Sequence, residues 1–435
     1  MVDKNTQGII LDPWFEHYAE RSSGLSASEV RSLFAVASRP EVVSLAGGMP
    51  YVRAISPDQI KTTLNRVIDE SGPEALQYGS GQGHPLLREH ITRIMALEGI
   101  AARPDDVVVT TGSQHGLDLV ARLFINPGDV VLAESPSYVG ALGVFRSYQA
   151  DVRHVQIDDE GIIPAALSAA ITQAQAENRP IKMIYLIPNF QNPAGVTLSA
   201  ARRLEIIDIA HDAGILIVED NPYGLLWFDQ PAPPAMRAAG DKGIIYLGSF
   251  SKTFAPGLRV GWVVAPHGIR EKLILANEAA VLSPSTFSQL VVADYLSQTD
   301  WQAQITSFRE LYRERRDAMV SALAHELPDI EHTTPGGGFF LWLTLPEGLN
   351  SKEMLPRAVT ELVAYTPGTA FFADDRGVQH LRLAFCYPPA EKIAEGVARL
   401  AKVIRDEVEL VNTFGPTQAS TNPNERVASP PPNLA

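Results

Sequence analysis

The sequence predicts an α/β protein in which a large domain, a mostly parallel sheet flanked by helices, is joined to a smaller α+β domain. The first observation is the length of 435 residues, which exceeds what one core usually holds, so two lobes are expected. The second is the alternation of short apolar runs with helix-like stretches between about residues 105 and 265, which is typical of strands joined by crossover helices. The third is a change of pattern after about residue 300.

Short apolar runs are the strand candidates of the large domain, and most of them end in polar or glycine-rich turns. Open α/β sheets bind ligands beyond the carboxyl ends of their strands, so these turns are where chemistry is expected. The candidates are DVVVT (106–110), VVLAE (130–134), KMIYLI (182–187), ILIVED (215–220), IIYLGS (244–249) and VGWVVA (260–265).

Helices are expected between and after these strands. LSAARRLEIIDIAHDAG offers Ser199 as an N-cap, apolar residues at helical spacing and Gly214 as the stop. A long helical tract follows at 300–327. The smaller domain then contains, in order, a strand at FFLWLTL (339–345), a helix near 351–364, a strand at RLAFC (382–386) and a helix near 390–408.

Composition narrows the class of protein. The net charge of −14 and the lack of a basic block disfavour a nucleic-acid partner. Cys386 is the only cysteine, so no intrachain disulfide can form, and the cytoplasm is the expected compartment. No stretch approaches the roughly 18 apolar residues of a membrane span, so no membrane association is expected.

Gly112, Ser113 and Gln114 lie in the turn TTGSQHGL, between the first strand and an apolar-periodic helix. Such a turn aims backbone N–H groups and the helix dipole at an anion, so a phosphate could bind there. Serine is also a common helix cap, and this turn alone fits either interpretation.

Amide and acidic side chains follow the next buried strands. LIPNFQNPAG places Asn189 and Asn192 among prolines, which is also an ordinary turn signal. IVEDNPYG ends with Glu219, Asp220 and Tyr223. Carboxylates after four apolar positions are costly to bury unless a cation meets them, and a capping or solvated carboxylate is the alternative.

Lys252 follows the strand in IIYLGSFSK, and Arg259 lies seven residues later. The lysine is either a solvated charge or a partly desolvated amine, whose lowered pKa makes it nucleophilic toward a carbonyl. The turns together offer an anion nest, an amide, a carboxylate, a phenol, an amine and a guanidinium at one sheet edge. Pyridoxal 5′-phosphate (PLP) needs this set, because its aldehyde forms a Schiff base, its ring nitrogen needs a carboxylate and its phosphate needs amides and an arginine. The sequence therefore predicts PLP as the cofactor and no metal.

The motifs SFSKTFAPGLRVGW, GSQHGL, SPSY, NPAG and DNPY resemble those of class I aminotransferases of PLP fold type I, and more narrowly the subgroup of 2-aminoadipate and kynurenine aminotransferases. The resemblance covers about residues 26–410. It implies that Lys252 forms the Schiff base and that Asp220 pairs with the ring nitrogen. The other implied cofactor contacts are Ser113, Gln114, Ser249 and Arg259 on the phosphate, Tyr138 on the ring face, and Asn192 and Tyr223 on the phenolic oxygen.

The same resemblance implies a substrate site. Arg382 in RLAF corresponds to the clamp for the substrate α-carboxylate, because a guanidinium fork matches two carboxylate oxygens, and Asn192 is expected beside it. LAGGMP and LQYGSGQG match segments around the substrate mouth and give Gly48 as a substrate contact and Tyr78 as a residue that reaches a neighbouring subunit's phosphate. Arg31, in a segment at the substrate entrance, is expected to face the substrate side chain.

The resemblance also implies domain boundaries and a homodimer with shared active sites. The tail is rich in Pro, Ser, Thr and Asn, so it cannot offset the entropy lost on ordering. The expected units are a flexible N-terminus (1–25), an N-terminal segment packing with the small domain (26–55), a large PLP-binding domain (56–300), a small C-terminal domain (301–411) and a disordered tail (412–435).

The function expected from the resemblance is ping-pong transamination from an aromatic, branched-chain or 2-aminoadipate-like L-amino acid to a 2-oxo acid, with 2-oxoglutarate as the expected acceptor. Lys252 is expected to move the proton between Cα and the coenzyme, with Asp220 and Tyr223 tuning the ring. A lyase or decarboxylase of the same fold would use the same lysine and remains an alternative. A PLP-binding transcriptional regulator is disfavoured, because some 45 residues before LAGGMP are too few for a DNA-binding module with its linker and the chain is acidic.

Overall fold

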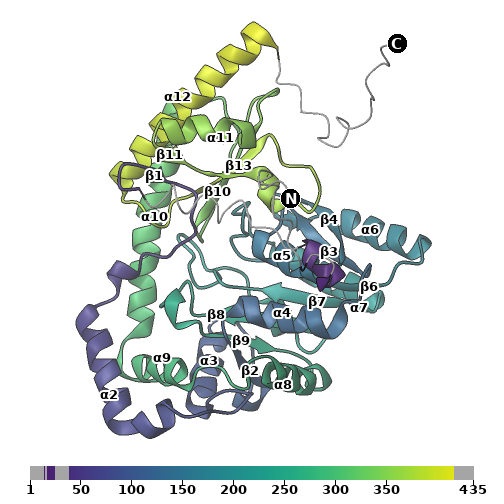
Figure 1. Ribbon diagram of the computed structural model, residues 1–435, viewed down its shortest axis with the longest axis vertical. Coiled ribbons are helices and arrows are strands. Elements are labelled where there is room, and N and C mark those ends of the chain that lie inside the picture. The colour runs from purple at the N-terminus through teal and green to yellow at the C-terminus, as the bar shows by residue number, and fades with distance from the viewer. Residues whose placement is uncertain (1–13, 15–16, 25–38, 416–435) are drawn as a thin grey trace, which may run out of the picture.

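The computed structural model describes residues 14, 17–24 and 39–415, and its centre is an eight-stranded sheet (Figure 1). The strand order is β2-β9-β8-β7-β6-β3-β4-β5. β3, β4, β6, β7 and β8 pair in parallel, so the predicted mostly parallel α/β sheet is confirmed. The strands are β2 (Val107–Thr110), β3 (Val130–Ser135), β4 (Asp151–Asp158), β5 (Gly161–Ile162), β6 (Ile181–Leu186), β7 (Leu216–Asp220), β8 (Ile244–Ser249) and β9 (Gly261–Val264).

β9 runs against the direction of its neighbours. It pairs antiparallel with β8 on one side and with β2 on the other. The register places Gly261, the first residue of β9, opposite both Ser249 at the end of β8 and Thr110 at the end of β2. The chain that leaves β8 therefore returns to the same edge of the sheet before β9 begins.

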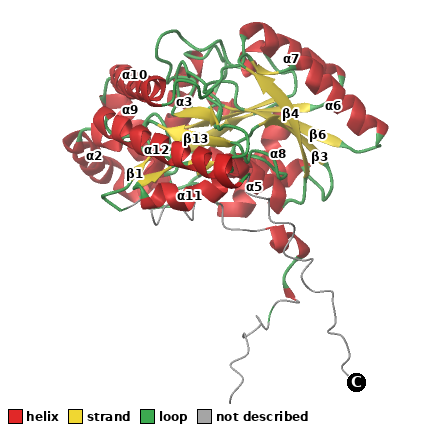
Figure 2. Cartoon of the chain, turned by 90° about the horizontal axis from the view of Figure 1, so that it is seen from above, coloured by secondary structure: helices red, strands yellow, loops and turns green. Residues whose placement is uncertain are grey.

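Helices cover both faces of this sheet, and successive strand residues feed two separate cores. On one face Val130, Ile184 and Ile217 pack with α6 (Pro164–Ala176) and α7 (Ala200–Asp212). On the other face Val131 and Val218 pack with helices that include α4 (Ser113–Phe124) and α5 (Val139–Ser147). Figure 2 shows α6 and α7 on the side of the sheet opposite α5. The remaining helices of the large domain are α2 (Pro57–Ala75), α3 (Pro85–Ala96), α8 (His267–Val281) and α9 (Thr286–Gln298).

The caps of α7 confirm its predicted ends. The Ser199 hydroxyl accepts a hydrogen bond from the Arg202 N–H, which satisfies one of the free donors of the first turn. Gly214 follows the helix with φ of +67°, a conformation that favours glycine because a Cβ would be strained.

A second, smaller unit follows α10 (Trp301–Glu326), the long helix that in Figure 1 runs from the level of α9 to that of α12. Its three-stranded antiparallel sheet has the order β10-β13-β12. The N-terminal strand β1 (Val43–Ser44) pairs in parallel with β11, so residues before the large sheet join this unit. The unit contains β10 (Phe340–Thr344), α11 (Ser351–Thr360), β11 (Val363–Ala364), β12 (Thr366–Pro367), β13 (His380–Ala384) and α12 (Ala390–Phe414).

Two predicted helix ends in this unit were wrong. The helix expected near 351–364 stops at Thr360, because Leu362 adopts a φ of +61° and the chain then pairs with β1. The helix expected near 390–408 continues to Phe414, which makes residues 412–414 of the expected tail helical. The rest of that tail, 416–435, lies outside the described residues.

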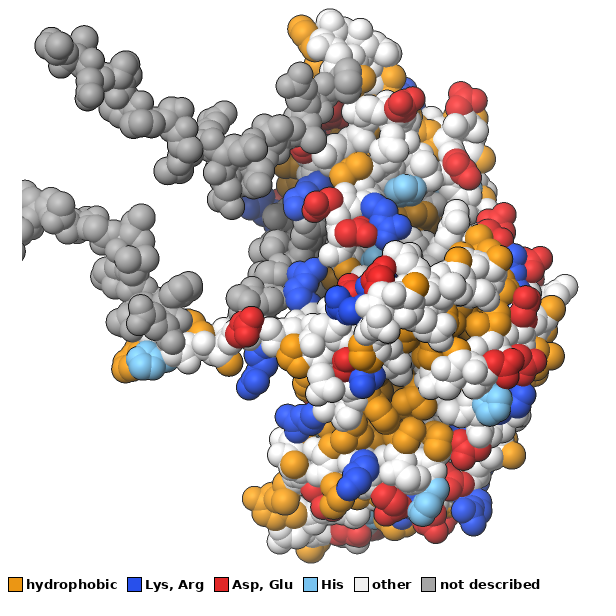
Figure 3. All heavy atoms as spheres, turned by 90° about the vertical axis from the view of Figure 1, so that its right-hand side faces the viewer, with side chains coloured by type: hydrophobic (Ala, Val, Ile, Leu, Met, Phe, Trp, Pro, Cys, Tyr) orange, Lys and Arg blue, Asp and Glu red, His pale blue; other side chains and the backbone are white. Residues whose placement is uncertain are grey.

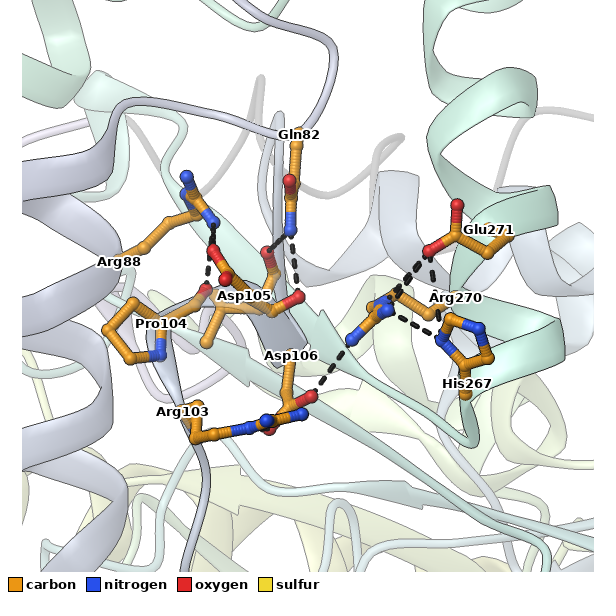
Figure 4. A network of polar contacts seen from close by, with 10 residues as sticks. Gln82, Arg88, Arg103, Pro104, Asp105, Asp106, His267, Arg270 and Glu271 are labelled. Carbon is orange, nitrogen blue, oxygen red and sulfur yellow. Dashed lines mark hydrogen bonds and ion pairs between the residues drawn. The ribbon is translucent and has the colours of Figure 1, made fainter.

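A polar network fixes the opposite end of β2, away from the strand-end turns (Figure 4). Arg270 of α8 donates to Asp106 at 2.9 Å and Arg88 of α3 to Asp105 at 3.1 Å. Gln82 donates to the Asp105 carbonyl at 2.9 Å. These contacts hold the start of β2 between two helices.

On the face shown in Figure 3, acidic and basic side chains are interspersed around apolar patches. In the described part of the chain, no helix is both long and apolar enough to cross a membrane.

Candidate active site

A cavity of about 540 Å³ lies at the edge of the large sheet where β8 ends and β9 begins. Because the chain returns between these strands, Lys252, after β8, and Arg259, before β9, both line the cavity. The predicted residues that line it are Gly48, Ser113, Gln114, Tyr138, Asn192, Asp220, Tyr223, Ser249, Lys252, Arg259 and Arg382.

The Lys252 amine lies inside this cavity. Its Nζ donates a hydrogen bond to the Gly48 carbonyl at 2.9 Å and lies 5.6 Å from the centre of the Phe339 ring. Burial is the main cause that lowers the pKa of Lys252 to about 8. The free amine is therefore more populated near neutral pH than that of an exposed lysine, and the free amine is the form that attacks a carbonyl.

Asp220 is the last residue of β7, and its carboxylate is buried. Its Oδ2 accepts a hydrogen bond from the Tyr185 hydroxyl at 2.9 Å, while Oδ1 is buried and has no hydrogen-bond partner among the described residues. Burial raises the pKa of Asp220 to about 6, against the opposing effects of Tyr185 and of the Lys252 charge. A buried acceptor without a donor costs free energy, and the protonated ring nitrogen of PLP is a donor that fits it.

The N-terminus of α4 and the Arg259 guanidinium form an anion cradle. Ser113 and Gln114 open α4 after Gly112, whose φ is +81°. Arg259 is exposed, and its Nη1 lies 3.4 Å from the Ser251 hydroxyl. A Cβ at Gly261 would lie 2.5 Å from the Ser113 nitrogen, so glycine lets β9 approach the helix N-terminus. Helix N–H groups and a guanidinium suit a phosphate dianion.

Arg382 is a buried cation of β13. It donates to the Asn192 side chain at 2.8 Å and to the Ala46 carbonyl at 2.6 Å, and its Nε is buried without a partner. Its hydrogen-bond acceptors among the described residues, including the Thr366 hydroxyl, are all neutral, and burial lowers the pKa of Arg382 to about 10. A buried guanidinium without a counterion is costly, so the site favours an incoming anion such as a carboxylate.

Aromatic rings bound the remaining walls. The Phe340 ring lies 4.0 Å from the Arg382 guanidinium carbon and 6.0 Å from the Tyr223 ring. A Cβ at Gly48 would lie 2.5 Å from Phe340, so a larger residue there would displace this ring. Tyr138 precedes α5, packs against Gly140 and lines the cavity.

One of the predicted residues does not line the cavity of the single chain. Tyr78 is 77% exposed and does not line it. Arg31 lies outside the described residues. Gln114 does line the cavity, but its amide already donates to the Gly140 carbonyl at 2.9 Å.

Sequence reasoning missed Tyr185, Ser251 and Phe340. Tyr185 lies within the predicted strand KMIYLI, and a tyrosine in a fully buried strand needs a partner for its hydroxyl, which was an available signal. Ser251 and Phe340 line the cavity without such a signal in the sequence.

Comparisons with known proteins agree over nearly the whole chain. The sequence profile described as aminotransferase class I and II matches residues 40–400. Aromatic-amino-acid aminotransferase 1 of Thermococcus litoralis is 40% identical over 398 residues, covering 91% of this chain and 95% of that protein. The 2-aminoadipate transaminase of Thermus thermophilus is 36% identical over 403 residues, covering 92% and 99%. The crystal structure of Pyrococcus horikoshii kynurenine aminotransferase in complex with PMP is 37% identical with a TM-score of 0.86, covering 90% of this chain and 98% of that one.

Proposed function

Because the chain belongs to the aminotransferase class I and II family, we propose that Lys252, Asp220 and Arg382 carry its reaction and that its amino donors are aromatic or 2-aminoadipate-like L-amino acids. The chain is a PLP-dependent aminotransferase of PLP fold type I. The observation that carries the proposed roles is that an amine with a lowered pKa, a carboxylate with a free buried oxygen and a buried guanidinium without a counterion line one cavity.

When bound, PLP supplies an electrophilic carbon for the substrate amine and a pyridinium ring that withdraws electrons from the substrate Cα. Lys252 accepts and returns the Cα proton at its Nζ, for which a pKa near 8 is well matched. Asp220 accepts the ring N–H at Oδ1, while Tyr185 holds its other oxygen. Ser113, Ser249 and Arg259 would hold the phosphate end.

Arg382 binds the substrate α-carboxylate, which supplies the counter-charge that the buried guanidinium lacks. Asn192 orients this guanidinium through the 2.8 Å hydrogen bond. The substrate side chain then lies among Gly48, Met49 and Phe340, whose apolar surfaces suit aromatic and long aliphatic groups. The proposed acceptor is 2-oxoglutarate.

The test of these roles is reductive labelling. The holoenzyme is reduced with borohydride, digested and mapped by mass spectrometry, and the pyridoxyl mass is expected on Lys252. Lys252→Ala should bind PLP without a reducible link and lose multiple turnover. A label at another lysine, or normal rates in Lys252→Ala, would refute the assignment.

A donor screen tests the substrate class. Holoenzyme without acceptor is mixed with single amino acids, and the matching 2-oxo acid is measured per active site. Tyrosine, phenylalanine, kynurenine and 2-aminoadipate are expected to give up to one equivalent quickly, and aspartate slowly. Fast release from aspartate alone would contradict the proposed donors, and ammonia or CO₂ in place of transfer would indicate a lyase or decarboxylase.

The active unit is proposed to be a homodimer. Leu76 and Tyr78 are each 77% exposed in the single chain, and burying such side chains against a second copy would remove apolar surface from water. Tyr78 then reaches the phosphate in the partner's site. Mixed dimers test this, because a Lys252→Ala subunit paired with a Tyr78→Ala subunit contains one intact site only if Tyr78 acts across the interface. No gain of activity on mixing would contradict the shared site.

Domain boundaries at 56, 301 and 412 are likewise proposed, and the separate sheets and the β1–β11 pairing support them. The helical continuation to Phe414 supports a last boundary a few residues later. A reducing compartment such as the cytoplasm is proposed because the single cysteine, Cys386, is buried.

A further inference from the structure

A carboxylate outside the cavity reaches the elements that carry its cofactor residues. Glu98 lies just after α3, and its two oxygens have different partners. Oε1 accepts a hydrogen bond from the Asn221 amide at 2.8 Å, and Oε2 accepts one from the Tyr246 hydroxyl at 2.6 Å. Asn221 is 5% and Tyr246 1% exposed, so the carboxylate points into the protein.

Asn221 directly follows Asp220 and shapes the turn that carries Tyr223. Its side-chain oxygen accepts from the Gly224 N–H at 3.1 Å and from the Asn189 amide at 2.9 Å, while its backbone N–H donates to the Leu247 carbonyl at 3.0 Å. Without Glu98 the amide hydrogens of this buried side chain would lose their acceptor. Glu98 therefore helps to fix the orientation of the Asn221 amide, together with the two donors to its oxygen.

The contacts of Glu98 and Asn221 extend to strand β8 and to the turn after β6. Tyr246 lies on β8, three residues before Ser249, and is paired in register with Glu219 of β7. Asn189 lies in the turn that carries Asn192, and its oxygen accepts from Arg203 at 2.6 Å. A Cβ at Gly224 would collide with the Glu98 carboxylate, so the turn after β7 is shaped around this group.

We propose that Glu98 is a positioning residue for the cofactor site: by holding Asn221 and Tyr246 it fixes the turns that present Asp220, Tyr223 and Asn192. This inference rests on the proposed roles of those three residues. Glu98 itself does not line the main cavity, so it acts through its neighbours.

The charge state of Glu98 guides the choice of variant. Burial raises the pKa of Glu98 to about 7, with Glu219 raising it further and Tyr246, Asn221 and Arg203 opposing. The neutral acid is thus accessible near neutral pH, and glutamine reproduces its shape and hydrogen-bonding pattern. Glu98→Gln is the conservative variant, and Glu98→Ala removes both acceptors.

The experiment compares the two variants as purified holoenzymes. Glu98→Ala is expected to bind PLP about tenfold more weakly, the equivalent of one lost hydrogen bond to a charged group. Its kcat should fall by a larger factor than KM for the amino acid rises, since Glu98 reaches Arg382 only indirectly, through the turn that carries Asn192. The pH midpoint of the visible absorbance of the bound cofactor should shift, and Glu98→Gln should restore all three properties.

A matched control is Glu407→Ala on α12, which removes a largely buried carboxylate paired with Arg357 in the small domain. It should lower the melting temperature without changing PLP affinity or the absorbance midpoint. If Glu98→Ala does not fold, Tyr246→Phe removes one contact only and should weaken PLP binding in the same direction.

A folded Glu98→Ala or Tyr246→Phe protein with wild-type PLP affinity and absorbance midpoint would overturn the inference. That outcome is distinct from failure of the proposed function, which shows as a borohydride label away from Lys252. If Lys252 is labelled normally and the Glu98 variants have wild-type PLP affinity and absorbance midpoint, only the positioning role is rejected.

Discussion

Removing the Tyr185 hydroxyl tests how the site sets the charge of Asp220. Tyr185→Phe keeps the fully buried ring and deletes the 2.9 Å hydrogen bond to Oδ2. A hydrogen bond to a charged group contributes about 1.5–3 kcal/mol, and one pKa unit corresponds to about 1.4 kcal/mol. The pKa of Asp220, already raised by burial to about 6, should therefore rise by about one to two units.

The consequence appears in the pH dependence of cofactor binding. At pH 7 the wild-type carboxyl is about nine-tenths ionised, and the variant carboxyl is ionised to between about a half and a tenth. PLP affinity of the apoprotein is measured by fluorescence titration from pH 5 to 9. The ratio of variant to wild-type dissociation constants should be largest at pH 5, where both carboxyls are mostly protonated, and should fall toward one at pH 9, where both are mostly ionised. Groups common to both proteins cancel in this ratio.

The free energy of unfolding of the apoprotein provides a second test, because the direction of its pH dependence follows from the raised pKa of Asp220. Because the folded pKa of Asp220 lies above its ordinary value, its contribution to stability is fully present below about pH 4 and is lost as pH rises through the folded pKa. In Tyr185→Phe this loss should extend about one to two units higher.

Tyr365→Phe is the control, since its hydroxyl donates to the Ser351 carbonyl at 2.5 Å in the small domain. It should lower stability without a pH-dependent change in PLP affinity. A Tyr185→Phe to wild-type ratio that is flat across the pH range would refute the coupling between Tyr185 and Asp220.

Two further substitutions test the ends of the cavity. Arg382→Lys should raise KM for the amino acid by about 100-fold, because an ammonium lacks the bidentate fork of a guanidinium and cannot also hold Asn192. An unchanged KM in steady-state assays would show that Arg382 is not part of the substrate site. Gly261→Ala should weaken PLP binding, because its Cβ would lie 2.5 Å from the Ser113 nitrogen. Gly268→Ala in α8 is the control and should leave PLP binding unchanged, because the space around Gly268 is open. Equal PLP affinities of the two variants would contradict the tight approach of β9 to α4.

The sequence predicts the strands well where both faces are buried. VVVT in β2 and IIYLGS in β8 are apolar almost throughout, so each stands out against its polar flanks. β4 was missed because DVRHVQID is mostly half-buried and carries no apolar run. The helix of α11 was extended too far because nothing in the residue type of Leu362 signals its positive φ.

Some residues of the candidate site could be predicted from the sequence and others could not. Lys252 and Asp220 follow recognisable strands, so their meeting at one edge could be predicted from chain order. The reversed direction of β9 could not, because a buried strand has the same pattern in either orientation, and the place of Arg259 depends on it. Tyr185 contacts Asp220 from a neighbouring strand, a relation that only the sheet order reveals.

With the roles proposed for Lys252 and Arg259, the return of the chain between β8 and β9 would tie both ends of the cofactor to one short stretch, the covalent anchor at Lys252 and the ionic anchor at Arg259. A local opening of that stretch would release the aldehyde end and the phosphate end together. The rate of cofactor loss and the rate of proteolysis in this stretch should consequently be correlated across conditions.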